Sequence, residues 1–108
     1  MSLRTTMARS GRMAVITADG VLDTLTASAF RETIEAACCQ DVDKLVLDMT
    51  HLTYLSSAGL RMLVYARQKM RDGVPIIIVG ANESIERTIR LVGFHYSVQL
   101  RATMPSPT

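Results

Sequence analysis

Residues 55–60, Leu-Ser-Ser-Ala-Gly-Leu, are the part of this 108-residue chain whose residue types come nearest to catalytic chemistry. Within them, Ser-Ala-Gly supplies the second half of G-x-S-x-G, the sharp turn that presents a nucleophilic serine in α/β-hydrolases. Leu55 stands where that motif needs its first glycine. Asp72 and His95 follow in the chain order of a hydrolase triad, but Asp72 is expected to end a helix that runs away from the serine. A small serine hydrolase is therefore only a remote alternative.

The two serines of this segment also have a purely structural interpretation. Ser56 and Ser57 stand immediately before a predicted helix. Serine is a preferred N-cap, and it stabilises a helix by about 1 kcal/mol because its side chain accepts a hydrogen bond from one unpaired backbone N–H. Residue chemistry alone therefore favours a capping role for these serines over a functional one.

The sequence motifs give no support for a cofactor or a metal. The chain has neither GxGxxG nor GxxxxGK[ST], so no glycine-rich loop is placed to bind phosphates. His51 and His95 are far apart, and no His, Cys or Asp cluster lies near either. Cys38 and Cys39 are neighbours in a predicted helix, where they lack CxxC spacing and cannot form an ordinary bridge. The helical period places Cys38 in the core and Cys39 in solvent.

The composition predicts one soluble domain. With 108 residues, 48% of them hydrophobic, the chain is long enough to fold without metals or disulfides. The net charge of +2 is too small to predict nucleic-acid binding. No apolar run approaches the roughly 20 residues of a membrane span, and the first residues do not resemble a secretory signal. We therefore expect a cytoplasmic protein that does not insert into a membrane.

Strands and helices alternate along the chain. The predicted elements are strands over 3–9 and 12–18, a helix from 23–24 to about 39, a strand over 44–48, a helix over 57–72 capped by Gly73, a strand over 75–79, a helix capped by Asn82 and ended by Gly93, and a strand over 98–100. Residues 49–56 are predicted to be a polar connection.

This alternation predicts an α/β fold with parallel strand pairing, because right-handed crossovers join the strands. We expect a single domain over residues 1–108, with its core at about 12–100 and a tail at 101–108. Its mixed sheet should have four or five strands packed with helices, and an opening hairpin should add an antiparallel edge. The strands at Leu45 and Ile77 should be neighbours near the centre, because they are the most apolar runs.

Three segments in this order resemble the STAS domain, the module named for sulphate transporters and anti-sigma factor antagonists. Residues 20–30 contain Gly-Val-Leu-Asp, then Thr-Ala and Phe, similar to the family's G-x-L-D…TA opening of its first helix. Residues 45–60 resemble its strand, loop and D-S-S-G-L element. Residues 85–93 match its hydrophobic helix ending in glycine. Together these segments cover most of the chain.

The resemblance implies a partner-switching protein that is not an enzyme. In the family's anti-sigma factor antagonists, a partner that is both serine kinase and anti-sigma factor phosphorylates the serine after the motif's aspartate. By position that serine is Ser57, so the implied protein binds this partner when unphosphorylated and is released when phosphorylated. A serine phosphatase is a further candidate partner. The implied contact residues are Asp23, Ser56, Ser57, Ala58, Gly59, Leu60 and Arg61.

Two positions depart from the family's pattern. Ser56 stands where the family usually has aspartate, and Ala58 where many members have a second serine or threonine. The missing carboxylate predicts slow phosphorylation of Ser57. The resemblance also admits a STAS scaffold that is never phosphorylated, such as the accessory subunit of a lipid-transporting membrane complex, with Ser57 only a cap. Many antagonists add a closing helix after the last strand, so another subunit could cover that flank here, which leaves the oligomeric state open.

Overall fold

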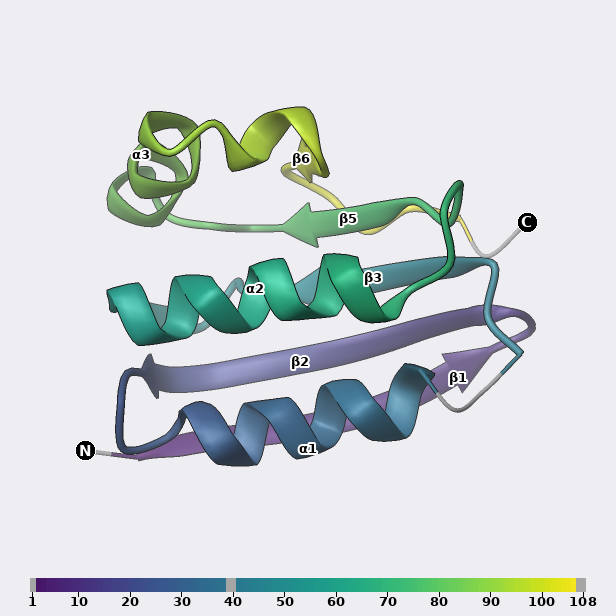
Figure 1. The fold of residues 1–108 in the computed structure, drawn as a ribbon, viewed down its shortest axis with the longest axis horizontal. Helices are drawn as coiled ribbons and strands as arrows, with labels where there is room; N and C mark the ends of the chain where they lie inside the picture. Colours follow the sequence, from purple (N-terminus) through teal and green to yellow (C-terminus); the bar gives the residue numbers. More distant parts are fainter. Residues whose placement is uncertain (1, 39–40, 107–108) are drawn as a thin grey trace.

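A mixed β-sheet forms the frame of the computed structural model, which describes residues 2–38 and 41–106 (Figure 1). The strands are β1 (Leu3–Ser10), β2 (Met13–Leu22), β3 (Lys44–Asp48), β4 (Leu52–Leu55), β5 (Ile76–Val79) and β6 (Gln99–Arg101). The helices are α1 (Ala27–Cys38), α2 (Ser57–Lys69) and α3 (Glu83–Leu91), followed by a 3₁₀ turn at Phe94–Tyr96. The strand order is β1-β2-β3-β5-β6, and β4 pairs with the far end of β2.

The pairing confirms the α/β class and the arrangement of the central strands. β1 and β2 form the predicted antiparallel hairpin, and the other paired strands of the described residues are parallel. Val46 of β3 lies opposite Ile77 of β5, so the two most apolar runs are neighbours as predicted. β5 lies between β3 and β6 and is buried along its whole length.

The sheet has six strands rather than four or five, because the predicted polar connection contains β4. β4 pairs with β2, whose last residues extend four positions beyond the predicted end at residue 18. Only Leu52 and Leu55 of β4 are buried, and Thr53 and Tyr54 are exposed. So short a strand with two exposed residues resembles a polar loop in sequence.

Helix α2 ends at Lys69, before the predicted Asp72. Met70 adopts an extended backbone and buries its side chain, which stops the helix there. Gly73 does take a left-handed conformation (φ 87), but in the turn that follows and not as the helix cap. The predictions for α3 are confirmed, since Asn82 caps it and Gly93 ends it with φ 78.

The core lies on both faces of the sheet, as the uninterrupted apolar strands predict. On the face covered by α1 and α2, the largest cluster includes Phe30, Ile34, Leu47 and Leu63, all buried. The opposite face carries a smaller buried cluster: Met13, Val46, Ile77 and Val79. The chain after β6 returns to the start of β3, where Lys44 Nζ donates to the carbonyl of Ser106 at 2.9 Å (Figure 1).

Cys38 is half-buried at the end of α1, with its Sγ 3.2 Å from the Sδ of Met70. It therefore packs at the margin of the core and not inside it. The prediction for Cys39 falls outside the described residues. No helix in the described ranges combines the length and apolar character needed to cross a bilayer.

Candidate functional site

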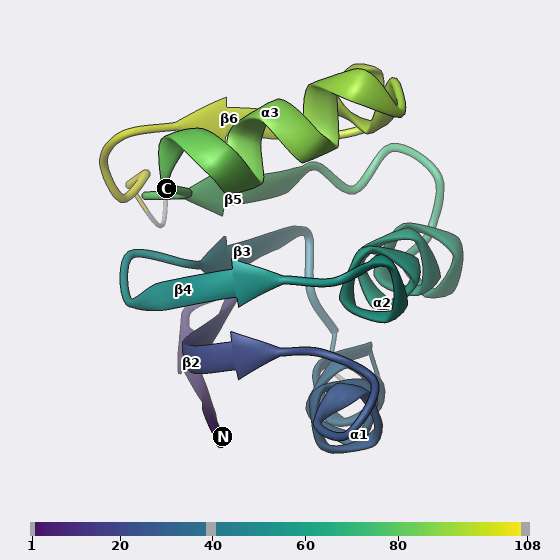
Figure 2. The same ribbon diagram turned by 90° about the vertical axis from the view of Figure 1, so that its left-hand side faces the viewer.

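The segment around Ser57 lies at the carboxyl end of β2 and β4, the edge where open α/β sheets place their binding sites. Because β2 and β4 are parallel neighbours, the turns that follow them meet. The N–H of Ser56 donates to the carbonyl of Leu22 at 2.9 Å and joins the two turns directly. Figure 2 looks onto this edge, where α1 and α2 leave the sheet side by side.

Gly59 allows the first turn of α2 to rest on the end of β2. A Cβ at this position would lie 2.8 Å from the carbonyl oxygen of Leu22 and 2.7 Å from Cδ1 of Leu55. Both distances are too short for non-bonded carbon. Gly59 is buried, and so is Ala58 beside it. These two residues therefore support the first turn of α2 from beneath, and their predicted contact with a partner stays a prediction.

The two serines have different roles. Ser56 is the N-cap of α2, with an extended backbone (φ −88, ψ 175) and an Oγ that accepts from the N–H of Gly59 at 3.2 Å. Ser57 is the first residue of the helix and is exposed. Its hydroxyl makes no hydrogen bond to any residue that the structure describes. The cap thus belongs to Ser56, and Ser57 is not needed for it.

Replacing Ser56 with alanine is expected to lower the free energy of unfolding by about 1 kcal/mol, because the N–H of Gly59 loses its acceptor. Ser56→Asp should retain the cap, since aspartate accepts from the same N–H. Ser57→Ala should change stability by less than about 0.5 kcal/mol, as is usual for an exposed position. Urea unfolding of the three variants measures the differences. A loss in Ser57→Ala with none in Ser56→Ala would assign the cap to Ser57.

Asp23 shapes the turn after β2. Its Oδ1 accepts from the N–H of Leu25 at 2.9 Å and from that of Thr26 at 3.2 Å. Thr26 Oγ1 in turn donates to the carbonyl of Val21 at 2.8 Å. In this tight turn Leu25 is 85% exposed. Asp23 thus holds the turn in shape, and its predicted contact with a partner stays a prediction.

Two exposed apolar side chains, which the sequence patterns did not single out, lie in the segments that precede α1 and α2. Leu25 follows β2, and Tyr54, 53% exposed, lies on β4 opposite Val21. Leu25 could have been found from the sequence, because it is an apolar residue in an otherwise polar turn. On α2 itself, Leu60 is half-buried and Arg61 is exposed. The segments around Ser57 therefore carry exposed apolar side chains and one exposed basic side chain.

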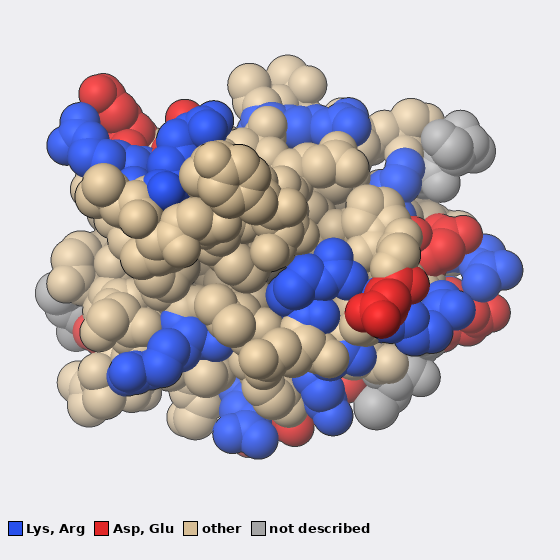
Figure 3. All heavy atoms as spheres, turned by 45° about the horizontal axis from the view of Figure 1, so that its top comes forward, with Lys and Arg blue, Asp and Glu red and all other residues tan. Residues whose placement is uncertain are grey.

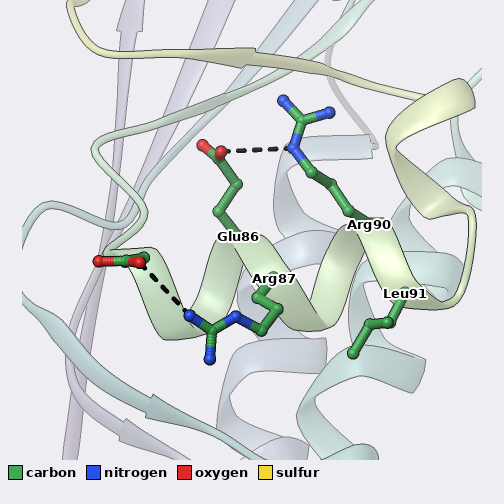
Figure 4. Close-up of a pocket in the computed structure, with 5 residues that line it drawn as sticks. Glu86, Arg87, Arg90 and Leu91 are labelled. Carbon is green, nitrogen blue, oxygen red and sulfur yellow. Dashed lines mark hydrogen bonds and ion pairs between the residues drawn. The ribbon is translucent and has the colours of Figure 1, made fainter.

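The arginines of α3 do not extend this surface into a basic patch. Arg87 pairs with Glu83 and Arg90 with Glu86, each at 3.3 Å, and with Leu91 they line a surface pocket of about 350 Å³ (Figure 4). Figure 3 shows basic side chains in separate groups, several beside acidic ones, with uncharged surface between them. Each arginine of this pocket has its charge matched on its own helix.

The remaining catalytic candidates are not brought together. Asp72 follows α2 and Ser57 begins it, so the length of the helix, roughly 20 Å, separates them. His95 lies in the 3₁₀ turn, with its ring 4.0 Å from that of Tyr96. Among residues 2–38 and 41–106, no three His, Cys, Asp or Glu side chains gather where they could hold a metal ion.

Comparison with known proteins gives concordant matches. The family model for the STAS domain matches residues 4–106. The chain is 28% identical over 103 residues to the anti-sigma-F factor antagonist RsfB of Mycobacterium tuberculosis, covering 95% of this chain and 84% of that protein. A crystal structure of an anti-sigma factor antagonist from Mycobacterium paratuberculosis has a TM-score of 0.88 and 25% identity, over 95% of this chain and 88% of the other. Phosphorylated SpoIIAA of Bacillus shares the fold, with a TM-score of 0.71 and 17% identity over 94% and 92%.

Proposed function

The chain belongs to the STAS domain family, and from this membership we propose that it acts as an anti-sigma factor antagonist in a partner-switching pathway. Its similarity to RsfB and to the antagonist from M. paratuberculosis, each over 95% of the chain, supports the role. One observation carries the mechanism: the Ser57 hydroxyl is exposed and uncommitted at the start of α2, while Ser56 supplies the cap. The role belongs to the cytoplasm, and it requires no cofactor, nucleic acid or catalytic activity of the chain itself.

The proposed partner is an anti-sigma factor that is also a serine kinase. It binds the unphosphorylated chain over the start of α2, where Ser57 and Arg61 are exposed, and over the turn after β2, where Leu25 is exposed. In the transfer step, Ser57 Oγ attacks the γ-phosphorus of ATP held by the kinase, the bond to ADP breaks, and the hydroxyl proton passes to a base of the kinase. A serine phosphatase would restore the hydroxyl by hydrolysis.

Phosphate at Ser57 should release the partner without unfolding the domain. It adds about −1.5 to −2 charges at pH 7, and the first turn of a helix tolerates negative charge because of the helix dipole. A partner packed on this turn would have to desolvate the dianion or meet it with a new cation. A loss of about 1.4 kcal/mol of binding free energy lowers the affinity tenfold.

Variants of Ser57 test the proposal. Ser57→Ala should bind the anti-sigma factor about as tightly as the unmodified chain but accept no phosphate. Ser57→Asp should bind at least about tenfold more weakly, a loss of about 1.4 kcal/mol. Ser57→Asn is the matched control for Ser57→Asp, because asparagine has nearly the size of aspartate and carries no charge. The measurements are calorimetric titration with the cognate anti-sigma factor, and incubation with that kinase and labelled ATP followed by mass mapping of the phosphate.

Two results would contradict the switch. One is label on Ser56 or elsewhere with none on Ser57, and the other is equal affinity of the phosphorylated and unphosphorylated chains. The scaffold alternative is favoured by one observation, that Ser56 occupies the place of the family's usual aspartate. A scaffold would accept no phosphate from the kinase. It would bind its partner by the same surface, and Ser57 would have a structural role only.

A further inference from the structure

We propose that Arg61 binds the phosphate of phosphorylated Ser57 within the same helix, so that phosphorylation also withdraws this arginine from the partner. The proposal rests on the proposed function and names a second participant in the same switch. Both side chains are exposed, and they are four residues apart on α2. The resemblance to other antagonists did not assign this role to Arg61.

The helix geometry places the two side chains on one face. The N–H of Leu60 donates to the carbonyl of Ser56 at 2.9 Å, so regular helix begins at the first turn. Residues four apart on a helix have Cβ atoms about 5–6 Å from each other. A phosphoserine and an arginine easily span this separation. The anionic side chain precedes the cationic one, which is the favourable order for such a pair.

Arg61 has no competing partner on its helix. α2 contains no acidic residue, so the side chains three and four positions from Arg61 are Ser57, Ala58, Val64 and Tyr65. Tyr65 is already committed, because its hydroxyl donates to Glu35 Oε2 at 2.8 Å. Arg61 makes no ion pair or hydrogen bond with any residue in the described ranges. Ser57 is therefore the one neighbour on this face that can become an anion for it.

Other arginines near the helices are engaged. Arg67 donates to the carbonyl of Arg71 at 3.1 Å, and Arg71 donates to that of Val42 at 2.8 Å. On α1, Arg31 lies 3.8 Å from Glu35 and 4.7 Å from the ring centre of Tyr65. The free guanidinium of Arg61 distinguishes it from each of these.

Three other charged side chains lie on the elements next to the first turn of α2. Asp23 lies in the turn after β2, and its Oδ1 already accepts from the N–H of Leu25 and that of Thr26. Arg31 and Glu35 lie on α1, which packs against α2. All three are unchanged when Arg61 is replaced. A comparison between variants at position 61 therefore isolates the contribution of Arg61 to the phosphate.

The test uses the full chain with phosphoserine inserted at position 57 during translation, so that no kinase is needed. The second pKa of its phosphate, about 6 in free phosphoserine, is measured by ³¹P NMR titration. In Arg61→Gln this pKa should rise by about 0.3 relative to the parent, because the dianion loses its cation. Arg61→Lys should restore part of the difference. Arg67→Gln, which removes the same charge almost three turns from position 57, should leave the pKa unchanged.

Equal pKa values in the parent and in Arg61→Gln would overturn the proposal, and so would an equal rise in Arg67→Gln. A second readout is the ¹⁵N-detected Nε–H signal of Arg61, which should become protected from exchange only when position 57 carries phosphate. A kinase that fails to modify Ser57 would refute the proposed function and leave this result readable. An unchanged titration would refute the role of Arg61 and leave the partner switch intact.

Discussion

Gly59→Ala is expected to destabilise the domain by about 2 kcal/mol, although alanine is the better helix former by about 1 kcal/mol. The added Cβ would meet the carbonyl oxygen of Leu22 at 2.8 Å, and that backbone atom cannot turn aside as a side chain can. The start of α2 would have to move away from β2. Because Ser57 begins this helix, its position relative to Leu25 should change as well.

Urea unfolding and partner titration measure the two effects of Gly59→Ala. Gly73→Ala is the control, since a Cβ there meets nothing within 4 Å and the cost comes only from its left-handed backbone. We expect Gly73→Ala to lose about 1 kcal/mol of stability and to keep its affinity for the partner. If Gly59→Ala were as stable as the parent, the close approach to Leu22 would not be what fixes the helix.

Phe30→Ala should produce the largest loss of stability, about 3–5 kcal/mol. The side chain of Phe30 has no exposed surface and lies in the cluster beneath α1. Removing the ring leaves a cavity that neighbouring side chains fill only in part. Such a loss is a large share of the 5–15 kcal/mol by which domains are typically stable.

Thermal and urea unfolding measure this loss, with Phe30→Leu as a second variant that keeps most of the volume. Phe30→Leu should fold and should cost less than Phe30→Ala. A loss below about 1 kcal/mol for Phe30→Ala would mean that the site collapses around the smaller side chain.

Local signals in the sequence predicted α3 fully. Asn82 caps the helix through a hydrogen bond from the N–H of Ile85 to its side chain at 2.9 Å, and Gly93 ends it. Both functions depend on residues close together in the chain. The buried strands β3 and β5 were predicted for a related reason, since their apolar runs need cover on both faces.

The features that sequence did not predict depend on contacts between distant segments. β4 is a strand because it pairs with β2, and Thr53 Oγ1 adds a hydrogen bond to the carbonyl of Gly20 at 2.9 Å. Ser56 and Ser57 are equally good caps in composition, so only the backbone decides between them. The close approach of Gly59 to Leu22 likewise exists only once β2 and α2 are assembled.

The anchoring of the first turn of α2 has a consequence for the speed of the proposed response. The hydrogen bond from Ser56 to Leu22 and the close packing of Gly59 hold this turn against β2. A phosphate added to Ser57 changes the surface where it is attached. No segment of the domain has to rearrange before this change affects a bound partner. The response time is then governed by the rates of phosphate transfer, phosphate removal and partner dissociation. The phosphorylated state then lasts until the phosphate ester is hydrolysed, and no slow change of conformation prolongs or delays it.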